Sequence, residues 1–200
     1  MGRATFEPKA SAHSCDEGVT DRIVLPRADH SRIVFLHGPV EETTIAGVVA
    51  QLLQLASINT KPIHLVISTY GGSVDEMFSL YDAIKFLPCP VHTVALGKVM
   101  SAGVLLLASG AKGNRLIGAS SRIMMHPVSG GAMGNVFEME NQTKEMRTLH
   151  DRMVLMLSRE TKMKKAYIEK FVMGKMLDHF MTPEEAIKHG IADKVIGSST

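Results

Sequence analysis

Short apolar runs alternate with longer amphipathic stretches along the chain from residue 32 onward. Three runs rich in β-branched residues end at turn-forming or polar residues and predict buried strands: Arg32–His37, Ile63–Ser68 and Val91–Leu96. Between them, apolar residues at helical spacing predict helices at Glu41–Ser57 and Ser73–Leu87. This alternation predicts an α/β fold with parallel strands joined by right-handed crossovers.

The rest of the chain combines short elements with one long helix. The predicted elements are a short apolar helix at Ser101–Ser109, strands at Arg115–Ile117 and Arg122–Met125, a helix at Asn135–Glu160, a helix at Lys164–Met173, a helix that opens at Thr182 and ends before Gly190, and a strand at Ile191–Ile196. The helix at 135–160 would be about 35–40 Å long at 1.5 Å per residue, which exceeds the core of a domain this size. We expect it to project and to bury its apolar positions against another subunit.

Composition narrows the class of protein. The 200 residues are 45% hydrophobic, which suits one domain, and the net charge of +2 gives no electrostatic footprint for nucleic acid. No apolar run approaches the ~20 residues of a membrane helix, and no secretory signal is visible. The only cysteines are Cys15 and Cys89, so we expect no disulfide framework and a cytoplasmic location. Residues 1–30 lack periodicity and predict a flexible arm, with a short strand at Arg22–Leu25.

Ser101 lies at the junction of a predicted strand and an apolar helix, within GKVMSAG. Unpaired N–H groups and the helix dipole favour negative charge there, which suits a nucleophile and the oxyanion that it creates. Serine is also a common N-cap, so the local pattern leaves both interpretations open. The hydrolase elbow G-x-S-x-G is not satisfied, because position 99 is Val. Lys98 offers a Ser–Lys alternative.

Two further features could serve catalysis. His126 ends a predicted strand beside the Gly-rich stretch 128–134 and could act as a general base, although a lone histidine is more often packed or solvated. The pair Gly71-Gly72 follows a strand, where it could form a turn or allow a ligand to approach its backbone N–H groups. Histidine spacing predicts no metal site, and no phosphate-binding glycine motif follows a strand.

Taken together, these stretches resemble the ClpP peptidase family over residues 31–196. The matching segments are RIVFLHGPV, AQLLQL, STYGGSV, LYDAIKFL, GKVMSAGVLLLASGAKGNR, SRIMMHP and FMTPEEAIKHGIADKVI, in the order and spacing of the family. The resemblance implies a ClpP/crotonase-like fold of repeated β-β-α units, with residues 31–200 as a single peptidase domain. It also implies that the helix at about 135–160 is a projecting handle and that residues 1–30 are an axial-loop arm.

The resemblance also implies a function for particular residues. The family's nucleophile, base and acid correspond to Ser101, His126 and Asp178, and its oxyanion donors to the N–H groups of Gly72 and Ala102. The residues expected to bind extended peptide substrate are Ser73, Val74, Gly130 and Gly131.

Family members also suggest partners for the chain. We expect heptameric rings stacked into a tetradecamer, with another ClpP subunit where the rings are mixed. We also expect an AAA+ Clp unfoldase that hydrolyses ATP, and unfolded polypeptide as the substrate. No cofactor or metal is expected in this chain, and no nucleic acid or membrane partner.

The sequence departs from the family pattern in places that bear on assembly. Leu177 stands where the family commonly has an arginine that pairs between rings, so Glu138 lacks its mate. His64 and Val66 occupy typically aromatic positions of the unfoldase-docking face. Two alternatives to an active protease therefore stay open: a weakly active or non-catalytic subunit of a mixed ring, and a crotonase-like acyl-CoA enzyme.

Overall fold

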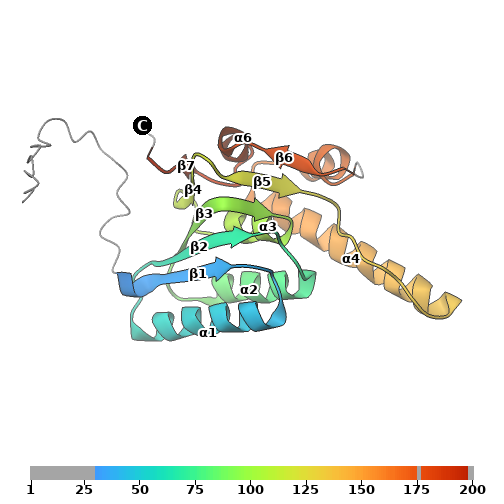
Figure 1. Cartoon of the computed structure of the whole chain (residues 1–200), viewed down its shortest axis with the longest axis horizontal. Coiled ribbons are helices and arrows are strands. Elements are labelled where there is room, and N and C mark those ends of the chain that lie inside the picture. The colour runs from blue at the N-terminus through green and yellow to red at the C-terminus, as the bar shows by residue number, and fades with distance from the viewer. Residues whose placement is uncertain (1–29, 175–176, 198–200) are drawn as a thin grey trace, which may run out of the picture.

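One sheet of seven strands organises the part of the chain that the structure, a computed structural model, describes: residues 30–174 and 177–197 (Figure 1). The strands are β1 (Ile33–His37), β2 (Ile63–Thr69), β3 (Val91–Met100), β4 (Arg115–Ile117), β5 (Arg122–Met125), β6 (His179–Met181) and β7 (Lys194–Val195). The main order is β1-β2-β3-β4-β7, and β5 pairs with β3 and with β6. Every pair is parallel except β5 with β6, so the predicted α/β fold is confirmed. The predicted arm and its strand at Arg22–Leu25 lie outside the described residues.

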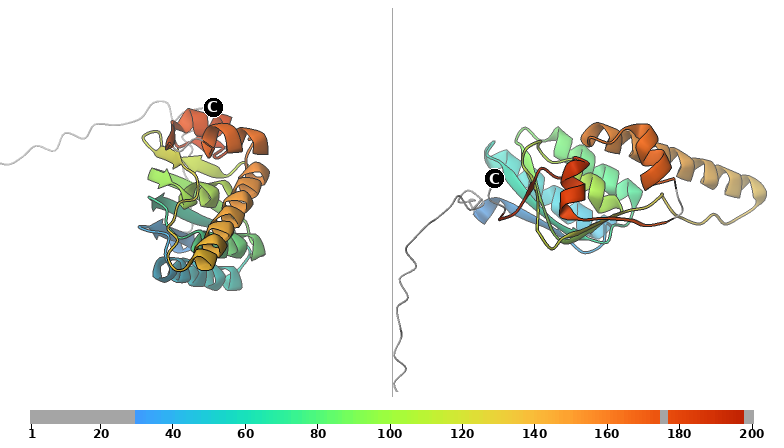
Figure 2. Two further views of the ribbon diagram at one scale, coloured as in Figure 1. Left: turned by 90° about the vertical axis from the view of Figure 1, so that its right-hand side faces the viewer. Right: turned by 90° about the horizontal axis from the view of Figure 1, so that it is seen from above.

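The helices follow the predicted order. They are α1 (Glu42–Ile58), α2 (Val74–Phe86), α3 (Ala102–Ala108), α4 (Val136–Glu160), α5 (Lys165–Tyr167) and α6 (Pro183–Lys188), with a 3-10 turn at His30–Arg32 and a π-turn at Ile168–Val172. Helices α1, α2 and α3 lie on one side of strands β1 to β3 (Figure 2). Val34 and Leu36 are fully buried beneath them, while Phe35 between them is exposed. Among residues 30–174 and 177–197, no helix therefore covers the opposite face of the sheet at β1.

Strand β3 is longer than predicted because it pairs with two strands in succession. Its first part, Thr93–Ala95, pairs with β4, and its last part, Lys98–Met100, pairs with β5. Gly97 lies between these parts with a φ of 70°, a backbone conformation that glycine adopts without strain. The change of partner carries β3 on to Met100 and sets Ser101 at its end.

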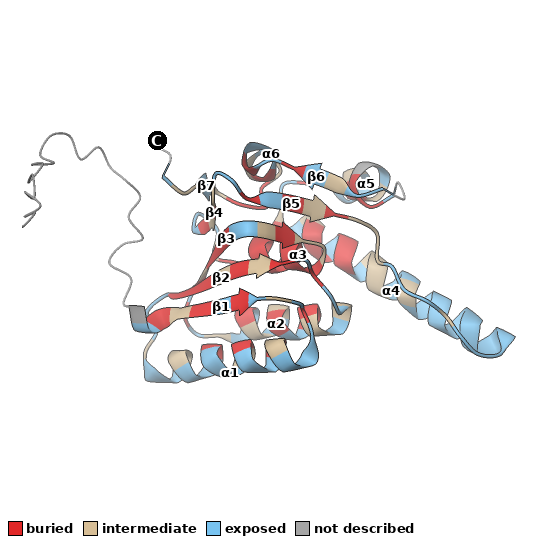
Figure 3. Cartoon of the chain, in the orientation of Figure 1, coloured by how far each residue is buried: buried red, intermediate tan, exposed pale blue. Residues whose placement is uncertain are grey.

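Helix α4 projects from the rest of the molecule, as predicted (Figure 1). Its N-terminal half is exposed and its C-terminal half is packed against the sheet domain (Figure 3). Met153 and Leu157 are buried there, whereas Met139 is exposed. Asn135 and Glu138 form a capping box at its start.

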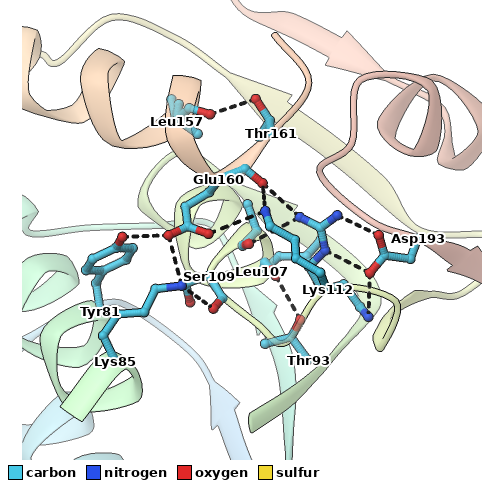
Figure 4. A network of polar contacts seen from close by, with 12 residues as sticks. Tyr81, Lys85, Thr93, Leu107, Ser109, Lys112, Leu157, Glu160, Thr161 and Asp193 are labelled. Carbon is cyan, nitrogen blue, oxygen red and sulfur yellow. Dashed lines mark hydrogen bonds and ion pairs between the residues drawn. The ribbon is translucent and has the colours of Figure 1, made fainter. Parts of the chain in front are cut away.

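The C-terminal end of α4 is fixed by a polar network around Glu160 (Figure 4). Tyr81 donates a hydrogen bond of 2.6 Å to the buried Glu160 carboxylate, and Lys85 forms an ion pair of 2.8 Å with it. Burial opposes ionisation of Glu160, but the hydrogen bonds from Lys85 and Tyr81 outweigh it and lower the pKa of this carboxyl. Arg115 donates to the Glu160 carbonyl and pairs with Asp193 before β7. The network ties the handle to α2, to β4 and to the C-terminal part of the chain.

The structure differs from the prediction at three elements near the C-terminus. The helix expected at Lys164–Met173 is a single α-turn followed by a π-turn, in which the Met173 N–H bonds the Ile168 carbonyl. The strand expected at Ile191–Ile196 is only Lys194–Val195. Strand β6 was not predicted, because its three residues form a strand only by pairing with β5. No helix of the described residues is long and apolar enough to cross a membrane.

Candidate active site

Ser101 occupies a strained turn between β3 and α3. Its φ of 53° and ψ of −122° make it the one non-glycine residue with positive φ in the described part of the chain. Its side chain makes no capping hydrogen bond, so the N-cap interpretation does not explain its presence. A residue held in such a conformation costs of the order of 1–3 kcal/mol, and such residues cluster at functional sites. The backbone holds it in place through a 2.8 Å hydrogen bond from the Ser101 N–H to the Met124 carbonyl.

The pair Gly71-Gly72 packs directly against this turn. A Cβ atom at Gly71 would lie only 2.6 Å from the Ser101 Cβ and 2.9 Å from the Met100 carbonyl oxygen. Gly72 forms a parallel bridge with Val40. In this bridge the Val40 N–H donates to the Gly71 carbonyl, and the Ser73 N–H donates to the Val40 carbonyl. The N–H of Gly72 therefore lies on the side away from Val40, where no described residue accepts it.

Ala102 offers a second free donor beside Ser101. As the first residue of α3, it has an N–H without an intrahelical partner. Gly72, Ala102 and Ser101 line one small pocket together with His126. Two backbone N–H groups and the end of a helix dipole thus lie beside the serine hydroxyl, an arrangement able to stabilise an oxyanion.

His126 directly follows β5 and is half-buried between two pockets. One is the small pocket that it shares with Ser101, and the other is lined by Met124, Leu177 and Asp178. Its Nδ1 atom lies 2.6 Å from the carbonyl oxygen of Pro127. His126 thus lines both the pocket of Ser101 and the pocket of Asp178.

Asp178 is exposed, immediately before β6. No hydrogen bond or ion pair joins Asp178 to His126 among the described residues, because the His126 Nδ1 atom faces the Pro127 carbonyl instead. The structure therefore brings the three predicted residues to adjoining pockets without a completed chain of hydrogen bonds between them. Their catalytic roles stay predictions.

Comparison with known proteins identifies the family. The family model for Clp protease matches residues 17–199. The chain is 39% identical over 166 residues to the ATP-dependent Clp protease proteolytic subunit of Deinococcus radiodurans, covering 82% of this chain and 80% of that protein. The chain belongs to the Clp protease family. Membership in this family of peptidases decides against the crotonase-like alternative.

The predicted peptide-binding residues of this Clp protease family member have different places around the site. Val74 lines the small pocket with Ser101, and Ser73 is exposed and accepts the Glu76 N–H at the start of α2. Gly130 lines a groove between residues 127–130 and the handle, and Gly131 is exposed beside it. Their roles in binding stay predictions as well.

Two residues near the site were not predicted to matter. Met153, from α4, lines the small pocket beside Ser101 and His126. His150, one turn earlier, accepts a hydrogen bond of 3.4 Å from the Val128 N–H, and burial lowers the pKa of its imidazole. Both lie on the face of α4 that packs against the sheet domain, and only this packing shows that they are close to the site.

The Ser–Lys alternative loses support, because the Lys98 Nζ atom lies 4.6 Å from the centre of the Tyr70 ring. No group of three metal-ligating side chains occurs among the described residues.

Proposed function

We propose that this chain is the proteolytic subunit of an ATP-dependent Clp protease, a serine endopeptidase that hydrolyses unfolded polypeptides inside a ring-shaped chamber. The observation that carries this proposal is the strained Ser101 turn, which shares one pocket with His126 and with two unpaired backbone N–H groups. Family membership and the name of the Deinococcus relative support the same activity.

The proposed mechanism is acyl transfer through a Ser101–His126–Asp178 triad. His126 accepts the Ser101 hydroxyl proton while the oxygen attacks the scissile carbonyl. The resulting oxyanion accepts hydrogen bonds from the N–H groups of Gly72 and Ala102. His126 then donates its proton to the leaving amine, and water, activated by the same imidazole, hydrolyses the acyl-enzyme.

Asp178 has the role of orienting His126 and stabilising its charged form. This requires the His126 Nδ1 atom to exchange the Pro127 carbonyl for the Asp178 carboxylate. We propose that assembly supplies this change, because α4 and residues 127–130 share a groove and would respond together to contacts at the handle.

The proposed assembly is a pair of stacked seven-membered rings in the cytoplasm, served by an AAA+ Clp unfoldase. The unfoldase would use ATP, and this chain would need no cofactor of its own. This arrangement is supported by the name of the relative, an ATP-dependent proteolytic subunit, and by the exposed apolar side chains at the N-terminal end of α4. Mixed rings with another ClpP subunit fit the same surfaces.

A weakly active or non-catalytic ring subunit is the second candidate. It is favoured by one observation, the missing hydrogen bond between Asp178 and His126. In that case the chain would contribute its handle and docking surfaces to a mixed ring while another subunit cleaved the substrate.

A fluorophosphonate probe separates the two candidates, because it reacts only with an activated serine. We expect labelling of the wild-type assembly and of Ser79→Ala, which alters an exposed serine of α2, and no labelling of Ser101→Ala. Peptide turnover should fall by roughly 10³-fold or more in Ser101→Ala, because triad members act as a unit. If neither the wild-type protein nor its mixed rings were labelled at this chain, the non-catalytic candidate would replace the protease.

A further inference from the structure

Four side chains form a row on the exposed sheet face beside the His126–Asp178 pocket, with two adjacent cations between two aromatic rings. The Lys98 Nζ atom lies 4.6 Å from the centre of the Tyr70 ring, and the Arg122 guanidinium lies 5.2 Å from the centre of the Phe180 ring. Lys98 on β3 and Arg122 on β5 are register partners, so the two pairs are neighbours. We call Tyr70, Lys98, Arg122 and Phe180 the cation–aromatic row.

The row lies on the same face as the proposed catalytic groups. Side chains alternate along a strand, so Arg122, Met124 and His126 share one face of β5, while Ile123 is fully buried on the other. On β6, Phe180 pairs with Met124, and Asp178 precedes it by two residues. Met124 lines the pocket with His126 and Asp178, and it therefore connects that pocket to the row.

The charges of the row are unpaired. Neither Lys98 nor Arg122 forms an ion pair with any carboxylate of the described residues. By the register of β5 and β6, Asp178 lies opposite His126, four positions along the chain from Arg122. Two adjacent cations without a counter-ion attract an anion, and a ring under each cation restricts its motion in advance of binding.

We propose that the cation–aromatic row is a specificity subsite that binds a carboxylate of the peptide substrate. This inference rests on the proposed protease function. Arg122 is four residues from His126, which is about 13 Å at 3.3 Å per residue along a strand. An extended peptide has the same rise, so the acidic side chain lies about three to four residues from the scissile bond. The planar Arg122 guanidinium suits two parallel hydrogen bonds to a carboxylate, and Lys98 adds a second charge.

The test measures kcat/KM for pairs of peptides with a single cleavage site. The two peptides of a pair differ only by Glu or Gln at one position, and that position is moved step by step along both sides of the cleaved bond. For the wild-type assembly we expect Glu to be favoured about fivefold to tenfold at three to four residues from the cleaved bond, and to be neutral elsewhere. The doubly substituted Lys98→Glu/Arg122→Glu variant should favour Gln at that position. The control Lys61→Glu/Lys164→Glu changes net charge equally at exposed lysines outside the row and should keep the wild-type preference.

The aromatic members provide a second measurement. Tyr70→Leu with Phe180→Leu should reduce the Glu preference at least twofold, because the rings restrain the cations. A Glu-to-Gln ratio of one in the wild type, or a ratio unaltered by Lys98→Glu/Arg122→Glu, would overturn the subsite. Loss of assembly in that variant, with the wild-type ratio at one, would identify the row as a subunit contact instead. Failure of the wild type to cleave either peptide or to react with the fluorophosphonate would overturn the protease function itself.

Discussion

Position 71 requires glycine, because Ser101 leaves room there for a hydrogen atom but not for a Cβ atom. Any side chain at position 71 would press a Cβ to 2.6 Å from the Ser101 Cβ, and it would also have to adopt a φ of 98°. The turn that exposes Ser101 therefore depends on a glycine in a different segment of the chain. The sequence shows the glycine pair after a strand, but only the fold shows which residue the missing side chain accommodates.

Gly71→Ala tests this requirement. We expect the free energy of unfolding to fall by about 2–4 kcal/mol, from overpacking and positive φ together, and peptide turnover to fall by roughly 10²-fold through displacement of Ser101. Gly113→Ala is a matched control, because its φ is 83° but a Cβ there meets open space. It should cost only about 1 kcal/mol and leave turnover unchanged. Urea unfolding and peptide assays measure both quantities, and wild-type turnover in Gly71→Ala would contradict the steric argument.

His64 and His92 form a second pair that only the fold brings into contact. They are register partners on β2 and β3, with ring centres 5.1 Å apart, and the Nδ1 atom of the buried His64 has no hydrogen-bond partner in the described part of the chain. Burial lowers the pKa of His64, and burial together with the His64 charge lowers the pKa of His92. Both imidazoles are therefore favoured in their neutral form in the folded protein.

This pair predicts a loss of stability in acid. The unfolded chain takes up protons near the ordinary histidine pKa of about 6.5, whereas the folded chain does so only at lower pH. As pH falls below about 6.5, the free energy of unfolding should decrease by up to about 1.4 kcal/mol per pH unit for each such histidine. His64→Phe should flatten this dependence in urea unfolding between pH 7.5 and 5, while His37→Phe, at an exposed site on β1, should retain it. Equal slopes in both variants would refute the assignment.

The sequence predicts those strands and helices whose formation depends on the pattern of their own residues. Each predicted strand from β1 to β5 is present, and so is the long helix. The sequence could not show that β3 continues to Met100, since that depends on β5, nor that β6 exists. The candidate site divides in the same way: Ser101 and His126 follow from local pattern and family resemblance, while Met153 and His150 depend on how α4 packs.

The end of α4 depends on one buried carboxylate. Glu160 accepts the Tyr81 hydroxyl and pairs with Lys85, and its pKa is lowered because these contacts outweigh the cost of burial. Glu160→Gln removes the charge and leaves Lys85 without its partner. We expect a loss of about 2–3 kcal/mol in the free energy of unfolding, less than for a fully buried pair because Lys85 is partly exposed.

Glu145→Gln is the matched control for this change, since it neutralises an exposed carboxylate of the same helix. It should alter stability by less than about 0.5 kcal/mol in the same urea titration. A Glu160→Gln protein as stable as Glu145→Gln would mean that the network contributes nothing to anchoring the handle.

At the scale of the whole molecule, α4 presents apolar surface that the described residues of one copy leave uncovered. Val136, Phe137 and Met139 are exposed at its N-terminal end, beside the exposed Met133. Apolar side chains grouped on a projecting helix gain about 25 cal/mol for each Å² that a partner removes from water. The proposed assembly of rings would cover this surface with the same helix of another copy, in a symmetric contact.

Two phenylalanines of almost equal exposure test this arrangement. Phe137 on α4 is 81% exposed and Phe86 at the end of α2 is 79% exposed, so Phe→Glu at either position adds the same charge to equally accessible surface. If copies of the chain join through their handles, Phe137→Glu places like charges in the contact and should reduce the assembly to smaller species at micromolar concentration, whereas Phe86→Glu should keep the wild-type mass. Light scattering distinguishes these outcomes. An unchanged mass for Phe137→Glu, or an equal loss in both variants, would exclude the handle as the joining surface.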